Sequence, residues 1–269
     1  MARCNFSVVQ QDGEFPPSFM SMVNRPGHHP AVIRIGGGCK HADPEVMQKM
    51  VSWILSEFAG ATCTVVSGGT AVMAAHFDAE KGRTVLEREG VMITHIPALL
   101  KQHGVNVIAA STTPRTEQMQ LHEDWGYVCV SGDYTLDFAQ DEAVVWQESA
   151  AVHATNWIAD VERFLVVHKQ WKEMGIPCAW LGIEGGQGTY DEAKLYLAAG
   201  IPCIFTAGSG RAMDLQLISE YRAGTLTVPA ENPNDDPVPV DRKLVRIINF
   251  LAPGELNREL RKLNIIPFR

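Results

Sequence analysis

The sequence lacks the residue spacings that mark several common catalytic sites. No CxxC pair occurs among its six cysteines, and its nine histidines include no HExxH or other metal-ligand spacing. The P-loop pattern GxxxxGK[ST], the GxSxG turn and a clean GxGxxG in the first strand-helix unit are also missing. These absences argue against metal catalysis, nucleophilic catalysis, P-loop hydrolysis and ordinary NAD-dependent hydride transfer. We therefore expect neither a metal nor a cofactor.

Long apolar runs and an excess of positive charge are missing too. No run of about 18 apolar residues could span a membrane, and residues 1–15 lack the apolar stretch of a signal peptide. We expect a cytoplasmic protein without a membrane partner. The 23 Lys and Arg against 31 Asp and Glu give a net charge of −8, which argues against a general nucleic-acid surface. A small anion can still bind, because backbone N–H groups attract phosphate without net positive charge.

Most of the cysteines lie inside apolar segments. Four of the six, Cys63, Cys129, Cys178 and Cys203, fall in runs that are typical of strands. Buried cysteine behaves as a small apolar residue, so we expect reduced core thiols rather than disulfides or metal ligands.

Short apolar runs alternate with segments of helical periodicity along the chain. We expect strands in 31–37, 61–69, 105–112, 125–133, 176–186 and 201–210, and helices in 43–58, 91–104, 142–174, 189–199 and 211–221. Continuous apolar strands between helices are typical of a parallel sheet that is covered on both faces. The sequence therefore predicts an α/β fold with a doubly wound, mostly parallel, Rossmann-like sheet.

A proline-rich acidic segment at 228–241 reads as a linker. It suggests a Rossmann-like domain over 1–227, followed by a linker and C-terminal helices over 228–269 that pack on it. Residues 242–264 read as two amphipathic helices broken at Pro253 and Gly254. This helical appendage would cap the core or form a dimer contact.

Glycine-rich turns follow four of the predicted strands, at 34–40, 66–73, 183–192 and 206–215. Ligands of open parallel sheets bind beyond the carboxyl ends of the strands, where glycine allows close approach and helix N-termini attract anions. The set predicts a nucleotide or another phosphorylated ligand, and the alternative is four ordinary structural turns. The candidate binding residues are Gly36, Gly37, Gly38, Ser67, Gly68, Gly69, Thr70, Gly185, Gly186, Gly188, Thr189, Gly208, Ser209, Gly210 and Arg211.

Two of these turns carry a family resemblance over about residues 31–220. Ser67, Gly68, Gly69 and Met73 resemble one motif of the SLOG superfamily of Rossmann-like nucleotide-binding domains, and Gly185, Gly186, Gly188, Thr189 and Glu192 match a second. That superfamily includes the LONELY GUY phosphoribohydrolases, long misannotated as lysine decarboxylases, the DprA/Smf proteins and the N-terminal domains of TRPM-type channels. The stretch 201–215 looks more like the TRPM-type branch. The resemblance implies a small-molecule nucleotide ligand and a possible homodimer.

The resemblance makes Glu192 the candidate catalytic residue. A carboxylate beside the ribose could stabilise the oxocarbenium-like centre of N-glycosidic cleavage or activate water. The alternative is that Glu192 interacts only with the N-terminus of its own helix. The chain departs from the enzymes at Glu184, where they have proline, and in 164–175, which lacks their arginine. Lys169 or Arg34 could replace that arginine.

Two further features leave alternatives open. Arg211 stands at the start of a predicted helix, where the dipole disfavours a cation, so we expect it to contact either a phosphate or Asp214. Residues 131–142 form a polar segment with an aromatic, which could bind ribose or stack on a base, with a surface loop as the default.

The sequence thus supports two functional hypotheses. The first is a module that binds a nucleotide or NAD-derived ligand, such as ADP-ribose or a nucleoside monophosphate, without turning it over. The second is a nucleotide N-glycosidase similar to the LONELY GUY enzymes. A purely structural protein would leave the four glycine-rich turns poorly explained.

Overall fold

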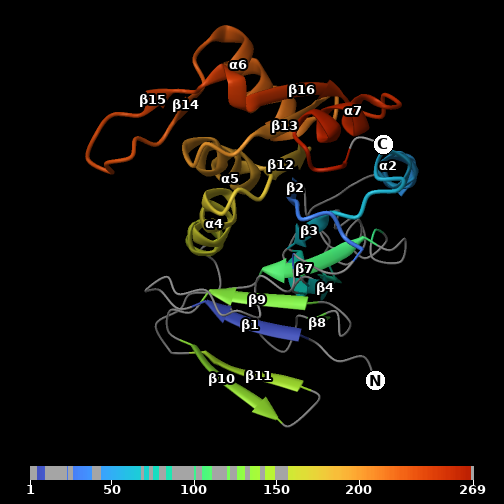
Figure 1. Ribbon diagram of the computed structural model, residues 1–269, viewed down its shortest axis with the longest axis vertical. Coiled ribbons are helices and arrows are strands. Elements are labelled where there is room, and N and C mark those ends of the chain that lie inside the picture. The colour runs from blue at the N-terminus through green and yellow to red at the C-terminus, as the bar shows by residue number, and fades with distance from the viewer. Residues whose placement is uncertain are drawn as a thin grey trace.

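An eight-stranded sheet runs through the computed structural model, which describes residues 5–9, 23, 27–37, 44–67, 70–72, 75–78, 83–86, 100, 105–110, 120–121, 126–130, 134–139, 143–148 and 157–267. In spatial order its strands are β1 (Asn5–Val9), β9 (Gly126–Val130), β7 (Asn106–Ala110), β3 (Thr64–Ser67), β2 (Val32–Gly37), β12 (Cys178–Ile183), β13 (Cys203–Ala207) and β16 (Val245–Asn249) (Figure 1). All neighbouring strands in this sheet are parallel. The predicted α/β fold is confirmed.

The direction in which the sheet grows reverses at its centre. From β2 the chain adds β3, β7 and β9 on one side, and then returns to place β12, β13 and β16 on the other. β2 and β12 are hydrogen-bonded neighbours over their full lengths, with Gly36 opposite Gly182 and Gly37 opposite Ile183. In a doubly wound sheet, such a reversal opens a crevice beyond the carboxyl ends of the two central strands.

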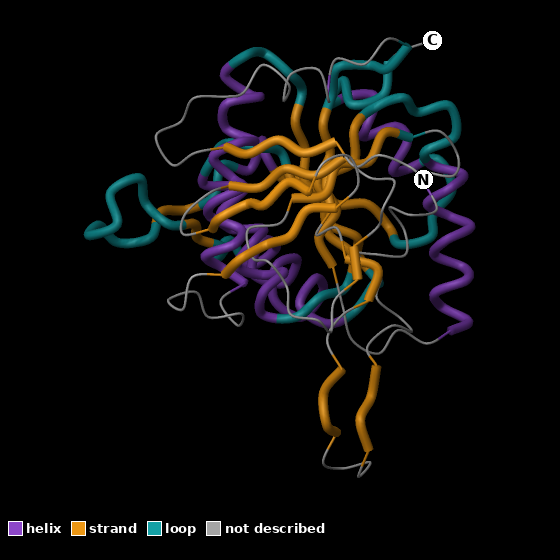
Figure 2. Tube along the Cα trace, turned by 90° about the horizontal axis from the view of Figure 1, so that it is seen from below, coloured by secondary structure: helices purple, strands orange, loops and turns teal. Residues whose placement is uncertain are grey.

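Helices cover both faces of the sheet (Figure 2). The described helices are α2 (Pro44–Glu57), α4 (Trp157–Glu173), α5 (Gln187–Ala198), α6 (Ser219–Ala223) and α7 (Glu255–Lys262), with a turn of π-helix at Met213–Ile218 and a 3-10 turn at Arg242–Leu244. Alternate strand residues point to opposite faces. Val32 and Trp180 pack toward α4 and α5, whereas Ile33 and Leu181 pack toward α2 and α7. The apolar runs are continuous because both faces are buried.

The remaining described strands form four small antiparallel pairs. They are β4 (Thr70–Val72) with β8 (Gln120–Leu121), β5 (Ala75–Asp78) with β6 (Arg83–Leu86), β10 (Tyr134–Ala139) with β11 (Ala143–Glu148), and β14 (Thr227–Val228) with β15 (Val238–Pro239). The β10 and β11 hairpin corrects two expectations, because residues 134–139 are not a loop and residues 143–148 are not helical. Periodicity alone cannot distinguish a helix from a strand in a segment this short, and here the backbone pairing of β10 with β11 decides for the strand.

The C-terminal segment differs from the two predicted helices. Residues 245–249 form β16, which pairs in parallel with β13 and extends the sheet, and α7 is the helix that follows. Val245 and Ile248 lie on opposite faces of the sheet, each in a buried cluster. The domain boundary expected after residue 227 stays a prediction.

A buried glutamate fixes α7 to the rest of the molecule. Glu57, at the end of α2, is 3% exposed, and its two carboxylate oxygens accept bonds from the backbone N–H groups of Gly254 (2.5 Å) and Asn257 (2.7 Å) at the start of α7. The amide of Asn257 donates in turn to the carbonyl of Glu57 at 2.7 Å. Glu57 thus accepts bonds from two N–H groups at the start of α7, a segment about 200 positions away in the sequence. Gly254, the N-cap of this helix, has no side chain that could accept such a bond.

Three of the predicted core thiols are confirmed. Cys63, Cys178 and Cys203 are buried and free, and burial raises the pKa of Cys63 and of Cys178 to about 12. The placement of the Cys129 side chain lies outside the described part of the structure. Among the helices that are described, none is both long and apolar enough to cross a bilayer.

Replacing Glu57 should destabilise the protein through α7. We expect Glu57→Ala to lower the free energy of unfolding by about 2 kcal/mol, because two partly buried N–H groups lose their acceptor. Chemical denaturation gives the value. Ser56→Ala is the matched control, since its hydroxyl only donates to the carbonyl of Trp53 within the same helix, and it should change stability by less than about 0.5 kcal/mol. Equal losses in the two variants would contradict a capping role for Glu57.

Candidate functional site

The turn between β12 and α5 lies at the central reversal of the sheet. Glu184 and Gly185 both have left-handed backbone conformations, with φ of 54° and 94°, and they turn the chain into the helix. A Cβ on Gly185 would also collide with the side chain of Thr189, so glycine is required there on two grounds. Gly186 is the N-cap of α5, and no side chain caps this helix end.

Hydrogen bonds join this turn to the turn after β13. The backbone N–H of Glu184 donates to the hydroxyl of Ser209 (2.9 Å), and that of Ala212 donates to the carbonyl of Gly185 (3.1 Å). A guanidinium nitrogen of Arg211 lies 3.5 Å from the position that a Cβ on Gly186 would take. The two glycine-rich turns therefore form one surface, although about 25 residues separate them in the sequence.

The end of β2 joins the same surface through Thr189. Its hydroxyl donates to the carbonyl of Gly37 at 3.3 Å, and its expected roles, capping α5 or binding phosphate, stay predictions. The structure thus brings together the turns at 36–37, 185–189 and 208–211. In the remaining turn, Ser67 ends β3 and Thr70 begins β4. Gly38, Gly68, Gly69 and Met73 lie outside the described residues.

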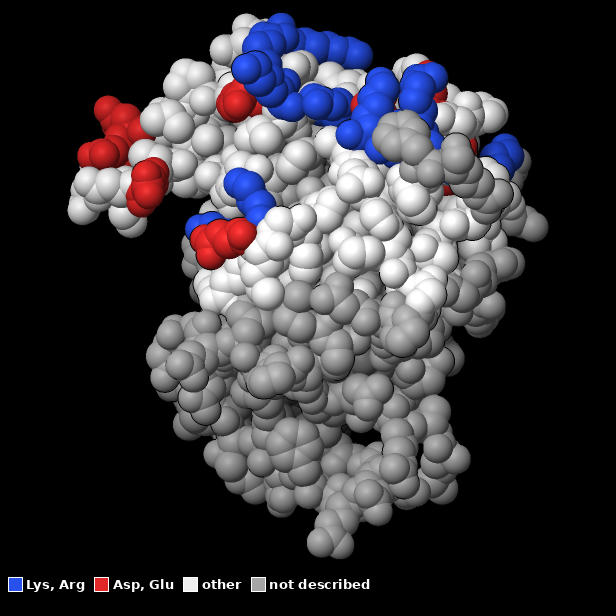
Figure 3. Space-filling model, viewed as in Figure 1, with Lys and Arg blue, Asp and Glu red and all other residues white. Residues whose placement is uncertain are grey.

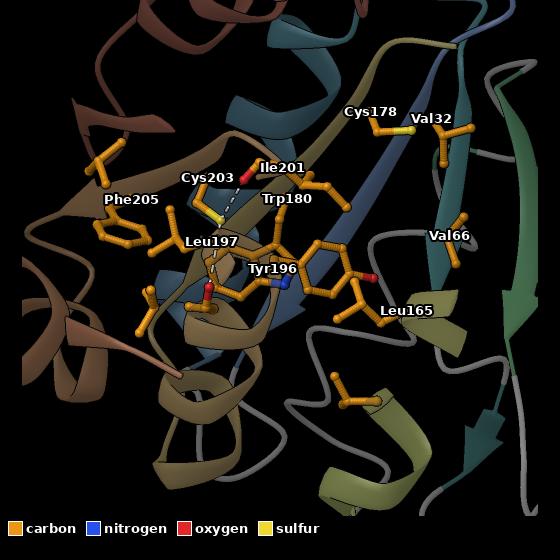
Figure 4. Packing of buried hydrophobic residues seen from close by; sticks show 14 of the residues in the cluster. Val32, Val66, Leu165, Cys178, Trp180, Tyr196, Leu197, Ile201, Cys203 and Phe205 are labelled. Atoms are coloured by element: carbon orange, nitrogen blue, oxygen red, sulfur yellow. Dashed lines mark hydrogen bonds between the residues drawn. The ribbon is translucent and has the colours of Figure 1, made fainter. Parts of the chain in front are cut away.

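The indole of Trp180, which packs with Tyr196 and Phe205 (Figure 4), explains why the two central strands contain glycine. A Cβ on Gly36 would lie 2.6 Å from this ring, and a Cβ on Gly182 would collide with it and with Met213. Trp180 is fully buried, with Phe205 and Tyr196 at centroid distances of 6.3 and 6.4 Å. Gly36, a predicted ligand contact, thus provides space for a core side chain.

Glu192 is part of a buried ion pair beneath the turns. Its Oε1 accepts bonds from the Nε of Arg34 on β2 (2.8 Å) and from the indole N–H of Trp180 on β12 (3.1 Å), and Arg34 and Glu192 are 6% and 7% exposed. Because α5 begins at Gln187, Glu192 lies in the second turn of the helix rather than the first. It faces the sheet and does not interact with the helix N-terminus.

Burial and charge act in opposite directions on this cluster. Burial, the largest single cause, would lower the pKa of Arg34, but the charge of Glu192, the neighbouring Tyr196 and the hydrogen bond to Glu192 together outweigh it, so the pKa is raised and the guanidinium stays charged. Burial raises the pKa of Tyr196 well above its ordinary value, and its hydroxyl lies 3.1 Å from Nδ1 of the buried His168. The cluster is an ion pair set among neutral aromatic side chains.

Asp214 accepts the N–H groups of the turn after β13. Its carboxylate bonds to the N–H of Gly208 (2.8 and 3.0 Å) and of Gly210 (2.5 Å). Ser209 is buried, and its hydroxyl donates to the carbonyl of Thr206 at 2.8 Å. An internal carboxylate therefore occupies the place where the sequence suggested a phosphate, and ligand binding by Gly208, Ser209 and Gly210 stays a prediction.

A positive and a negative group meet at the opening of α5. Arg211 is exposed and has a φ of 53°, the left-handed region that side chains rarely adopt. Partial burial raises the pKa of the neighbouring Glu184, although Arg211 opposes that shift. Gln187 and Gly188 are exposed at the first turn of α5, and that turn contains no acidic residue. The partial positive charge of the helix end is thus not offset by an acid of its own first turn.

Of Lys169 and Arg34, the two candidates to replace the arginine of the LONELY GUY enzymes, only Arg34 lies beside Glu192. Lys169 is exposed on α4, while its neighbour Lys172 donates to the carbonyl of Ala199 at the end of α5 (2.9 Å). Sequence reasoning missed Trp180 altogether. One signal was available: an arginine inside a buried strand needs a buried acid, and Glu192 shares a helix face with Ala193 and Tyr196. Among the described residues, no group of three or more His, Cys, Asp or Glu side chains could hold a metal ion.

Among the comparisons with known proteins, only the one with solved structures finds proteins similar to this chain. No family model matches the chain, and no curated protein matches it. The structure of TM1055 covers 86% of this chain and 98% of its own, with 12% sequence identity and a TM-score of 0.46. The molybdenum cofactor carrier protein from Chlamydomonas reinhardtii covers 87% of this chain and 97% of its own, with 15% identity and a TM-score of 0.45. The assignment of the fold rests on the strand order of the sheet.

Replacing both partners of the buried ion pair should cost less stability than the two single losses added together. We expect Glu192→Gln or Arg34→Met alone to lower the free energy of unfolding by about 3 kcal/mol or more, because each leaves the other charge buried. The double variant should lose less than the sum of the two. Asp191→Asn, next along the helix and half-buried, is the control and should change stability by less than about 0.5 kcal/mol.

Unfolding of the wild type, the two single variants and the double variant in guanidinium chloride gives the four free energies of a double-mutant cycle. Additive losses would mean that the two side chains do not stabilise each other. Unchanged stability in Glu192→Gln would instead indicate a carboxylate held ready for a ligand.

Proposed function

We propose that this protein binds a phosphorylated small molecule, a nucleotide or NAD-derived ligand such as ADP-ribose or a nucleoside monophosphate, at the central crevice of the sheet. The phosphate lies at the N-terminus of α5, beside Arg211. The observation that carries the proposal is the position of this helix end. It opens at the reversal between β2 and β12, and no side chain caps it.

Space and charge at this point support an anion. A Cβ on Gly188 would meet no atom within 4 Å, so the backbone of the first turn can be approached closely. The guanidinium of Arg211 extends over Gly186 from the adjoining turn. A helix N-terminus with a cation beside its N-cap residue is a suitable combination for phosphate.

The buried ion pair favours binding over hydrolysis. A carboxylate that stabilises an oxocarbenium-like centre has to reach the sugar. The Oε1 of Glu192 is engaged by Arg34 and Trp180, and the residue is 7% exposed. We therefore assign Glu192 the role of holding α5 on the sheet, and we place N-glycosidase activity second.

A thermal-shift series with AMP, ADP-ribose, NAD, cyclic AMP and ribose 5-phosphate tests the proposal. A ligand at about 100 times its Kd adds roughly 2.7 kcal/mol to the stability of the native state, which is readily measured. We expect a shift with at least one nucleotide, and chromatography of the same mixtures should show no released base. Released base that disappears in Glu192→Ala would establish the glycosidase. No shift with any of these compounds would contradict nucleotide binding.

Two substitutions locate the ligand. Arg211→Gln should weaken binding about tenfold or more, whereas Arg222→Gln, an exposed arginine on α6, should leave it unchanged. Gly188→Ala should weaken binding while preserving or raising stability, because a methyl fits the free protein and alanine favours the helix. Unaltered affinity in both Arg211→Gln and Gly188→Ala would place the ligand elsewhere.

Glu184 should make binding depend on pH. Its pKa is raised above the ordinary 4.5 by partial burial, so in the native state it gains a proton at a higher pH than in the unfolded chain. Its contribution to stability is therefore largest in acid and is lost as the pH rises through the raised pKa. Loss of its negative charge should favour an anion beside Arg211, so affinity should rise as the pH falls toward that pKa.

Titration calorimetry with ADP-ribose between about pH 8 and about pH 5 measures this dependence. In Glu184→Gln, affinity at neutral pH should be higher than in the wild type and the slope with pH should flatten. Parallel pH profiles in the two proteins would exclude Glu184 from the site.

A further inference from the structure

Negative charge is concentrated on the loop between β14 and β15. Residues 229–237, here named the acidic arm, contain Glu231, Asp235 and Asp236 and no Lys or Arg. All but Ala230 are exposed. Figures 1 and 2 both show this loop extending away from the rest of the described structure.

Positive charge is concentrated on β16 and its flanking helical turns. Residues 242–262 hold six Lys or Arg and two Glu, in a chain whose net charge is −8. We name five of these residues the basic face: Arg242, Lys243, Arg246, Arg258 and Lys262. Figure 3 shows Lys and Arg side chains gathered over this end of the molecule, separate from the acidic side chains of the arm.

The basic face has more cations than its own carboxylates neutralise. Glu259, 8% exposed, faces three cations: Lys262 at 2.7 Å, Arg246 at 3.7 Å and Arg258 at 3.8 Å. The side chains of Arg258 and Lys262 remain 61% and 56% exposed. Glu255 also interacts with Arg258, so two carboxylates face the six cations of 242–262 and a surplus of positive charge remains at the surface.

The acidic arm is ordered before it meets a partner. Pro229, Pro233 and Pro237 restrict its backbone, and the side-chain oxygen of Asn232 accepts a bond from the N–H of Asn234 (3.1 Å). The N–H of Asp235 donates to the carbonyl of Asn232 at 3.0 Å. A loop that is already restricted loses less conformational entropy when it docks.

We propose that the acidic arm of one molecule docks on the basic face of a second copy of this chain. The acidic arm and the basic face carry opposite charges, belong to the same chain and lie at different places on it. Two-fold symmetry would then give two equal contacts in each dimer, arm to face and face to arm. Because these charges are exposed, salt should weaken the association.

A charge swap tests this pairing in the intact protein. The arm variant carries Glu231→Lys, Asp235→Lys and Asp236→Lys, and the face variant carries Arg242→Glu, Lys243→Glu and Arg258→Glu. All six positions are exposed, so both variants should fold, and circular dichroism verifies this. Each variant alone sets like charges against each other, whereas the mixed dimer has opposite charges at both contacts.

Sedimentation velocity at about 50 mM salt gives the result. We expect the wild type to dimerise, with affinity on the order of tenfold weaker near 300 mM salt. Each variant alone should be monomeric, and their equimolar mixture should dimerise. An arm variant with Glu231→Gln, Asp235→Asn and Asp236→Asn should show an intermediate loss.

Three outcomes would overturn the proposal. They are a wild type that is monomeric at every protein concentration at low salt, a mixture that fails to dimerise, and an arm variant that dimerises as the wild type does. A different result would point to a polyanionic partner: the wild type and the arm variant bind equally to a heparin column, and the face variant does not.

Discussion

The ion pair between Arg34 and Glu192 is the contact on which the central arrangement depends. Burying two charges is unfavourable unless each finds its partner with good geometry. Here the arginine comes from β2, the glutamate from α5 and a second donor, the indole N–H of Trp180, from β12. One polar cluster thus adds a side-chain contact between the helix and both strands at the reversal of the sheet, which their backbone pairing already joins. The turns above it are joined to one another by separate bonds, from Glu184 N–H to Ser209 and from Ala212 N–H to Gly185.

The surrounding core fits this contact. The indole of Trp180 needs the space that Gly36 and Gly182 provide, and its N–H needs the Glu192 carboxylate. The same logic appears at the far side of α2, where Glu57 satisfies the start of α7. In both places a buried carboxylate links segments that are far apart in sequence. Several glycines and acids that suggest a ligand site in the sequence are therefore parts of the fold.

The sequence predicted the fold better than it predicted the roles of residues. Strands such as 178–183 and 203–207 are buried on both faces, so their apolar runs and following glycines were clear signals. The pattern of 245–249 predicts a helix, but a short apolar run with flanking basic residues also fits a strand, and only pairing with β13 decides between them. The partner of Thr189 could not be predicted, since its bond to Gly37 joins segments 152 positions apart.

The ion pair also bears on how quickly a ligand can bind. The opening of α5 is anchored from below by Arg34 and laterally by the bond between Ala212 and Gly185. A site built on an anchored helix end has little rearrangement to make when its ligand arrives. The association rate should then be set by diffusion and by attraction toward the helix end and Arg211, and differences in affinity among ligands should appear mainly as differences in residence time.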